Sequence, residues 1–171
     1  MSPRPGLARL ATLRRDIIVN MLLGSWLVPP PLRVSALRRF GMHLGEGVNV
    51  RARCFFGGTD VQMGARTFVN YGCFFDNSAS IVLGSDCQLG MEVMLCTSSH
   101  ELGPASRRAG ADAPAPIVVG PGCWLGARST LLPGATLGAG CVIAAGSVVT
   151  GECPPNGLYA GVPAKRVRDL S

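Results

Sequence analysis

Charged residues are scarce in this chain of 171 residues, at 15%, and aromatic residues account for only 6%. Hydrophobic residues reach 47%, a balance that suits a single domain burying much of its surface, including against other subunits. Lysine occurs once and histidine twice. Two histidines cannot build a catalytic zinc site from three histidines, so the sequence argues against a zinc-dependent lyase of that kind.

No long hydrophobic run is present. The most apolar stretch, residues 17–28, has only 12 residues and includes Asn20, whereas a membrane-spanning helix needs roughly 20. A signal peptide has a similar shape, but three prolines (29–31) follow instead of a small-residue cleavage site. The apolar spacing over residues 7–28 predicts a helix that ends at these prolines, and a second short segment at 32–40 that packs on the rest of the chain or on another subunit.

Positive charge is concentrated at the N-terminus. Residues 1–53 hold nine of the 15 arginines but only two acidic residues, and the remainder is nearly neutral. This basic segment could make weak contact with an anionic membrane surface, or it could be the solvated face of a packed helix. Nucleic-acid binding is not expected, since no recognised module or interleaving of aromatic and basic residues accompanies the charge.

The dominant pattern is a period of six residues. Six aliphatic residues recur at this spacing, and a small residue follows each after four positions. The aliphatic set is Val119, Leu125, Leu131, Leu137, Ile143 and Val149. The small set is Cys123, Ser129, Ala135, Cys141, Ser147 and Cys153. This period is typical of the hexapeptide parallel β-helix, in which three hexapeptides form one triangular coil.

The register divides the chain into two parts. Residues 1–43 form the predicted helical segment, and residues 44–171 form a β-helix of about five coils with a C-terminal tail. An extra residue within 57–62 and a two-residue slip between Ile81 and Leu83 interrupt the period. Residues 101–116 break it completely and are predicted to form an extruded loop, because loops of this length in a compact domain are usually functional or disordered.

The seven cysteines follow the same register. Six of them stand four positions after an aliphatic residue, and Cys96 is the exception. The six are Cys54, Cys73, Cys87, Cys123, Cys141 and Cys153. Cysteine in such corners acts as a compact hydrophobic residue, and neither the odd count nor the absence of CxxC spacing indicates disulfides. We therefore expect reduced thiols and a cytoplasmic protein.

The two histidines occupy different settings. His43 lies in FGMHLGEG, at the entry to the first coil, and His100 ends TSSH, where the extruded loop begins. A loop at this junction could cover a ligand, so His100 is the better candidate for a catalytic residue.

Several motifs together resemble the galactoside and maltose O-acetyltransferases, which are left-handed β-helix enzymes that use acetyl-CoA. The resemblance extends over residues 68–170, about 60% of the chain. The matching motifs are FVNYGCFFDN (68–77), SSH (98–100), RRAGADAPAPI (107–117), CWLGARSTLLPG (123–134), AAGSVVT (144–150) and AGVPAKRVRDL (160–170).

The resemblance implies a role for particular residues. His100 would be the general base that takes a proton from the acceptor hydroxyl, a role that imidazole can fill near neutral pH. The backbone N–H at Ala127 would stabilise the oxyanion. Asn70 and Asp76 match positions that line the acceptor pocket.

The coenzyme A site is implied in the same way. Trp124 matches an aromatic residue beside the pantetheine arm, and the backbone at Ala127, Ala145 and Gly146 matches the edge that binds it. Positions at the nucleotide end are matched by Thr150, Lys165 and Arg168. The resemblance also implies a homotrimer with sites between neighbouring subunits, and no metal.

Two departures limit the resemblance. The family carries a basic residue where this chain has Gly151, so phosphate contacts could shift to Arg166. Residues 1–43 are more similar to the leader of polysaccharide-biosynthesis acetyltransferases than to the helical domain of the galactoside enzymes. The expected acceptor is therefore a hydroxyl of a sugar, a glycan intermediate or a glycosylated small molecule. An amine acceptor, or a non-catalytic trimeric scaffold, remains an alternative.

Overall fold

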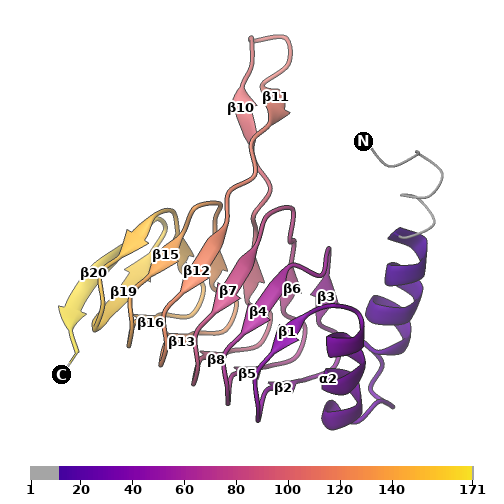
Figure 1. The fold of residues 1–171 in the computed structure, drawn as a ribbon. Coiled ribbons are helices and arrows are strands. Elements are labelled where there is room, and N and C mark those ends of the chain that lie inside the picture. The colour runs from indigo at the N-terminus through magenta and orange to yellow at the C-terminus, as the bar shows by residue number, and fades with distance from the viewer. Residues whose placement is uncertain (1–11, 171) are drawn as a thin grey trace.

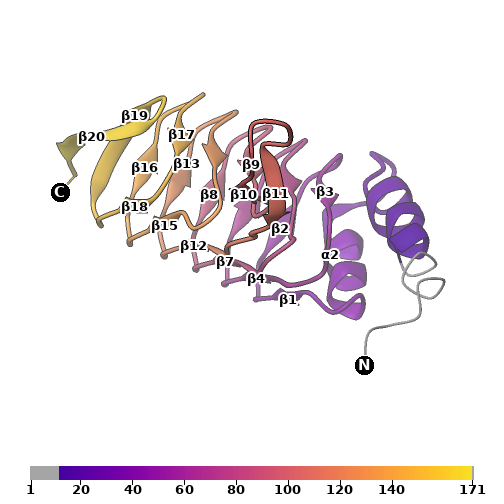
Figure 2. The same cartoon turned by 90° about the horizontal axis from the view of Figure 1, so that it is seen from above.

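The computed structural model describes residues 12–170 (Figure 1). The chain winds through five complete triangular coils and a partial sixth, which confirms the predicted parallel β-helix. Short helices cover the first coil, and a hairpin extends from one corner of the prism. Figure 2 shows the coils stacked in sequence order from the N-terminal helices to the C-terminal strand β20.

Three parallel sheets form the sides of the prism. Face 1 contains β1 (His43–Leu44), β4 (Val61–Met63), β7 (Ile81–Leu83), β12 (Ile117–Val119), β15 (Thr136–Leu137) and β18 (Glu152–Cys153). Face 2 contains β2 (Asn49–Val50), β5 (Phe68–Val69), β8 (Gln88–Leu89), β13 (Trp124–Leu125), β16 (Val142–Ile143), β19 (Gly157–Gly161) and the antiparallel β20 (Ala164–Asp169). Face 3 contains β3 (Phe55–Phe56), β6 (Phe74–Phe75), β9 (Met94–Leu95), β14 (Thr130–Leu131) and β17 (Val148–Val149).

The six-residue period becomes a set of inward ladders. Leu125, for example, is fully buried and pairs in register with Leu89 in the coil before it and Ile143 in the coil after it. All six aliphatic residues of the repeat are at most 1% exposed. The core is therefore a stack of aliphatic side chains along the prism axis, and its stability comes from contacts between neighbouring coils.

Replacing Leu125 with alanine should lower the free energy of unfolding by about 2–5 kcal/mol, because the neighbouring ladder residues cannot close the cavity. Chemical denaturation followed by circular dichroism measures this loss. The variant Thr136→Ala alters an exposed side chain of face 1 and serves as its control. A loss below 1 kcal/mol for the leucine variant would contradict the proposed packing.

Two departures from the six-residue period have structural causes. Ile81 and Leu83 both point inward from the ends of β7, and Leu83 pairs with Met63 and Val119 in the ladder of face 1. The apparent slip therefore reflects a longer corner before β7. Cys153 also differs from its predicted corner position, because it pairs with Leu137 in the ladder of face 1. The fifth coil, which runs from Leu137 to Cys153, is shorter than three hexapeptides.

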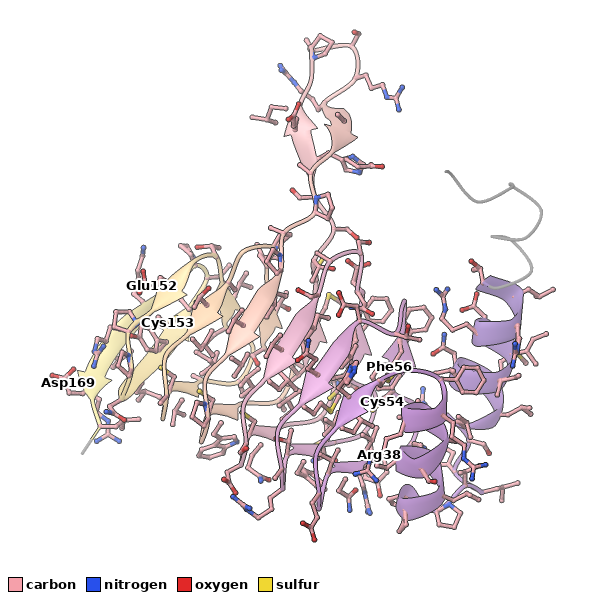
Figure 3. All side chains as sticks on the ribbon, viewed as in Figure 1. Arg38, Cys54, Phe56, Glu152, Cys153 and Asp169 are labelled. Atoms are coloured by element: carbon pink, nitrogen blue, oxygen red, sulfur yellow. The ribbon has the colours of Figure 1, made fainter. Side chains whose placement is uncertain are left out.

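The six cysteines predicted to be buried are buried, and all seven are free thiols. The Cys87 and Cys123 thiols donate to the carbonyls of Gly120 and Gly138 in the next coil, over 3.2 and 3.1 Å. Burial raises the pKa of Cys123 to about 12, so that this thiol stays protonated at neutral pH. In Figure 3 the labelled Cys54 and Phe56 belong to the first coil and Cys153 to the last.

The N-terminal helix differs from the prediction. A helical turn at residues 12–15 continues as the π-helix η1 (Asp16–Leu22), which ends well before the prolines. The prolines instead begin α2 (Pro30–Arg39), because proline's fixed φ and missing N–H suit the first turn of a helix. Residues 7–11 of the predicted helix lie outside the described residues. None of the helices within residues 12–170 combines the length and apolarity needed to cross a bilayer.

A single arginine holds the segment between these helices. Arg33 is 3% exposed and donates to the carbonyls of Leu23, Ser25, Val28 and Val50 over 2.6–2.9 Å. These bonds join residues 23–28 and α2 to the first coil of the prism. The predicted packing of the second helical segment on the prism is therefore observed.

The predicted loop 101–116 contains regular structure. Strands β10 (His100–Leu102) and β11 (Ala109–Asp112) pair as an antiparallel hairpin that stands away from the prism (Figure 1). Its residues are mostly exposed, so the hairpin is held mainly by its own backbone hydrogen bonds. The absence of an apolar repeat over this segment reflects its position outside the core.

Candidate active site

Most of the predicted functional residues lie at two corners of the prism, on either side of face 3, and the others lie on face 2. The 2–3 corner comprises the turns that join face 2 to face 3, after β2, β5, β8, β13 and β16. The 3–1 corner comprises the turns that join face 3 to face 1, after β3, β6, β9, β14 and β17, and it carries the hairpin.

A groove of about 530 Å³ runs along the 2–3 corner. It contains four of the predicted residues and is otherwise apolar. The predicted residues are Asn70, Trp124, Ala127 and Ala145, and their neighbours include Met91 and Leu158. A concave, mostly apolar site with a few polar groups is typical of a small-molecule binding site.

Among the residues that line this groove, Ala127 and Ala145 have backbone N–H groups that donate to no acceptor within residues 12–170. Glycines make their position possible. A Cβ on Gly90 would lie 2.6 Å from the nitrogen of Ala127, and a Cβ on Gly126 would lie 2.5 Å from that of Ala145. The glycines therefore let successive turns stack closely while leaving an N–H available on each.

Outward side chains of face 2 continue the groove toward the C-terminus. Trp124 is 57% exposed and pairs in register with Val142, which pairs with Leu158, which pairs with Arg168 on β20. Lys165 is exposed on the same strand, opposite Ala160. Gly146 has φ of 70° and a built Cβ there would meet nothing within 4 Å, so the backbone beside Ala145 is open.

Asn70 lies at the N-terminal end of the groove. Its Oδ1 accepts a hydrogen bond from the backbone N–H of Tyr71 over 2.9 Å, and its Nδ2 lies 3.3 Å from the Sδ of Met91. The sulfur is a weak acceptor, so the amide can exchange this contact for a ligand oxygen.

His100 begins the hairpin at the 3–1 corner and is not part of the groove in the same subunit. Its Nδ1 lies 3.2 Å from Oδ1 of Asp112, on the opposite strand of the hairpin. A carboxylate at this nitrogen favours the tautomer with the proton on Nδ1, which leaves Nε2 as the acceptor. Asp112 was not among the predicted site residues, although it lies within the matching motif at residues 107–117.

Asp76 lies at the 3–1 corner and holds residues 97–98, which lead into His100. Its Oδ2 accepts hydrogen bonds from the backbone N–H and hydroxyl groups of both Thr97 and Ser98, over 2.5–3.1 Å. Burial alone would raise the pKa of Asp76, but the bonds from Ser98 and Thr97 lower it. The ionised carboxylate therefore fixes the SSH segment, and its stabilising contribution is lost as the pH falls through this lowered pKa.

Thr150 and Arg166, which were expected to meet the nucleotide, differ in position or in contacts from Lys165 and Arg168. Thr150 is exposed at the 3–1 corner, away from Lys165 and Arg168 on face 2. Arg166 donates to the carbonyls of Pro154, Pro155 and Asn156 and pairs with Asp169 at 2.7 Å. These bonds hold the end of the prism together, which argues against the predicted transfer of phosphate contacts to Arg166.

The structure thus separates the predicted residues into two sets within one subunit. Asn70, Trp124, Ala127 and Ala145 line the groove, whereas His100, Asp76 and Thr150 lie across face 3. Within residues 12–170 no group of three or more His, Cys, Asp and Glu side chains is arranged to hold a metal ion.

Comparison with known proteins agrees with the hexapeptide β-helix fold. The sequence signature described as bacterial transferase hexapeptide (six repeats) matches residues 116–151. A putative acetyltransferase of Schizosaccharomyces pombe is 42% identical over 113 residues, which cover 66% of this chain and 55% of that protein. The galactoside O-acetyltransferase of Escherichia coli is 28% identical over 81% of this chain and 69% of its own length.

Solved structures extend the likeness to the whole chain. The crystal structure of a hexapeptide-repeat acetyltransferase from Vibrio cholerae, complexed with acetyl-CoA, covers 100% of this chain and 93% of its own, with a TM-score of 0.87 and 28% identity. The match to the Schizosaccharomyces protein spans only a little over half of that relative's length. The chain is a hexapeptide-repeat β-helix protein, similar in sequence and in fold to the acetyl-CoA-dependent acetyltransferases of this kind.

Proposed function

We propose that this chain transfers an acetyl group from acetyl-CoA to a hydroxyl of a sugar, a glycan intermediate or a glycosylated small molecule. The observation that carries the proposal is the groove at the 2–3 corner, where two unpartnered backbone N–H groups lie beside an exposed tryptophan. The pantetheine arm of coenzyme A is slender and carries amide groups, so it needs such apolar walls and backbone hydrogen-bond partners. Relatives that bind coenzyme A or acetyl-CoA in this fold support the assignment.

The groove also has a direction. From Ala127 it runs past Ala145 and Trp124 toward Lys165 and Arg168, two exposed basic residues on β20. Basic side chains form charge-assisted contacts with phosphates. The thioester therefore lies near Ala127, and the nucleotide lies toward the C-terminal end.

The chemistry follows from this placement. Nε2 of His100 takes the proton of the acceptor hydroxyl as the oxygen attacks the thioester carbonyl, and the Ala127 N–H donates to the oxygen on which negative charge develops. The C–S bond then breaks, the acetyl group remains on the acceptor oxygen, and the proton held by His100 passes to the departing thiolate. Asp112 keeps His100 in the required tautomer through its contact with Nδ1.

The site is complete only when two subunits meet. His100 lies at the 3–1 corner and the groove at the 2–3 corner, so the histidine of one subunit has to reach the groove of another. Head-to-tail contacts between unlike corners close into a ring, and a triangular prism suits a ring of three. We therefore propose a homotrimer with three shared sites. The seven free thiols support the expected reducing, cytoplasmic setting.

Trp124→Ala should raise the KM for acetyl-CoA by about tenfold with a smaller effect on kcat, because the side chain supplies binding area along the pantetheine arm. The matched control is Gln88→Ala, which alters the exposed neighbour of Trp124 in the same row of face 2. Initial rates at varied acetyl-CoA measure both constants. An unchanged KM in the tryptophan variant would place the coenzyme elsewhere.

An acceptor screen tests the activity itself. Free thiol released from acetyl-CoA is followed with mono- and disaccharides, their amino-sugar counterparts and simple glycosides, and mass spectrometry identifies the acetylated product. O-acetylated sugar is the expected product. Exclusive acetylation of amino groups would replace the proposal with N-transfer, and failure to bind coenzyme A by calorimetry would favour a scaffold.

A further inference from the structure

A second hollow lies beside the N-terminal end of the groove. Its volume is about 400 Å³, and it is lined by Trp26, Arg53, Tyr71, Gly72, Met91 and Glu92. Met91 also lines the groove, so the two hollows adjoin at this residue. Asn70, whose amide contacts Met91, lies on the groove side of the boundary.

An exposed aromatic surface forms one wall of this hollow. Trp26 is 62% exposed, and its ring lies 4.8 Å from that of Tyr71 at an angle of 33°. The segment that carries it is fixed, since Arg33 donates to the carbonyl of Ser25, and the carbonyl of Gly24 accepts the N–H of Arg53 over 2.8 Å. A large aromatic ring is thus held rigidly with much of its surface open to a ligand.

One arginine, Arg53, lines the hollow, and a second, Arg51, lines an adjoining hollow that shares Trp26 and Tyr71 with it. Arg51 donates to the hydroxyl of Tyr71 over 2.5 Å, and its guanidinium lies 4.8 Å from the centre of that ring. Arg53 is exposed and lines the hollow together with Tyr71. Among residues 12–170 neither arginine forms an ion pair, and the buried Nε of Arg51 has no hydrogen-bond partner.

The one acidic residue of the hollow is already neutralised. The carboxylate of Glu92 lies 2.7 Å from Nε of Arg128 in the next coil. The charge that a ligand meets in the hollow is therefore that of Arg53, and Arg51 adds positive charge at the shared Tyr71 wall. Guanidinium groups bind phosphates and carboxylates with paired hydrogen bonds.

The direction of the groove places this hollow on the acceptor side. Coenzyme A, in the proposed function, extends from Ala127 toward the C-terminus, so the acceptor has to approach from coils nearer the N-terminus. Ala127 lies in the fourth coil and Arg53 in the first. Three inter-coil spacings of about 4.8 Å separate them by about 14 Å along the prism.

We propose that the acceptor is an anionic saccharide. Its ring stacks on Trp26, and a phosphate or carboxylate group is bound by Arg53, on the order of 10–14 Å from the hydroxyl that is acetylated. Arg51, at the shared Tyr71 wall, adds to the positive charge that attracts this group. This distance fits a disaccharide or longer unit with the charge at its far end, rather than a neutral monosaccharide. The inference rests on the proposed acetyl transfer and specifies its acceptor.

Matched pairs of acceptors test this proposal. Maltose is compared with maltose 1-phosphate, and cellobiose with cellobiouronic acid, with kcat/KM measured from thiol release. The wild-type protein should prefer the charged member of at least one pair by about tenfold or more, and the pair that shows the preference distinguishes phosphate from carboxylate. Equal use of the charged and neutral members of both pairs would overturn the proposal.

Variants then connect the preference to the two arginines. Arg51→Gln combined with Arg53→Asn should abolish the preference for the charged acceptor and leave the KM for acetyl-CoA unchanged. Asparagine is chosen because residue 53 has φ of 64°, which asparagine tolerates. Arg39→Gln removes an exposed arginine on α2, outside this hollow, and should keep the preference. A preference that survives in the double variant would refute the assignment.

Direct binding separates this inference from the proposed function. Saturation-transfer NMR measures contact of maltose 1-phosphate and of cellobiouronic acid with the protein in the presence of coenzyme A, without turnover. Arginine-dependent binding without any acetyl transfer would overturn the catalytic assignment and retain the anionic subsite. Acetyl transfer to neutral and charged acceptors alike, with no arginine dependence, would retain the activity and overturn the subsite.

Discussion

Replacing His100 with alanine should lower kcat for acetyl transfer by roughly 10²–10⁴-fold, the range expected when a general base is lost. The reason is chemical: no other described side chain in the hairpin can take the hydroxyl proton at neutral pH from the position of Nε2. Because the walls that hold the coenzyme come from the groove residues and not from the histidine of the neighbouring subunit, the affinity for coenzyme A, measured by calorimetry, should stay the same. The variant should therefore have a lower kcat and an unchanged affinity for coenzyme A.

Two controls define this result. His43→Ala removes the other histidine, which is exposed on β1 of face 1, and should leave kcat unchanged. Asp112→Asn should reduce kcat less than His100→Ala does, because the amide can still contact Nδ1 but no longer fixes the tautomer. Turnover unaffected by His100→Ala, with the trimer intact, would remove His100 from the mechanism.

Replacing Ala127 with proline should lower kcat by roughly 10²–10³-fold, the cost of losing one oxyanion donor. Proline removes the N–H of Ala127 without requiring a new turn. The residue after Ala127, Arg128, is left-handed with φ of 58°. The turn that joins β12 to β13 has the same geometry, with Pro121 followed by Gly122 at φ of 71°. The sequences Gly126-Ala127-Arg128 and Gly120-Pro121-Gly122 thus occupy equivalent turns, and proline is suited to the position before a left-handed residue.

The same substitution at a distant corner provides the control. Ala139 stands at the equivalent position of the turn before Gly140, whose φ is 67°, and it does not line the groove. Ala139→Pro should fold and retain activity. If both proline variants lose activity equally and unfold at lower denaturant, the effect belongs to the turn and not to the N–H group.

The prism itself could be predicted from the sequence because its signal is local and repeated. Each hexapeptide buries its aliphatic residue and the small residue four positions later, so the spacing from Val119 to Val149 predicts the fold directly. Where coils differ in length the periodicity misleads, as at Ile81 and Cys153, since strand register depends on the neighbouring coil as well as on the chain.

The candidate site was predictable in part. The groove residues Trp124, Ala127 and Ala145 follow from a motif with fixed spacing on a rigid scaffold, and they do lie together. The contact between His100 and Asp112 could not be derived, because it depends on how a segment outside the periodic core pairs with itself. The roles of Arg33 and Arg166 also depend on carbonyls distant in sequence, which an arginine count does not reveal.

The central claim is that the histidine of one subunit serves the groove of another. Mixed trimers test it most directly. His100→Ala subunits and Ala127→Pro subunits, each nearly inactive alone, are unfolded together, refolded and assayed. Random assembly places an intact histidine next to an intact groove in about a quarter of the sites, so the account predicts that about a quarter of wild-type activity returns. Mixed trimers that assemble but stay as inactive as the parent variants would show that each site is built within one chain.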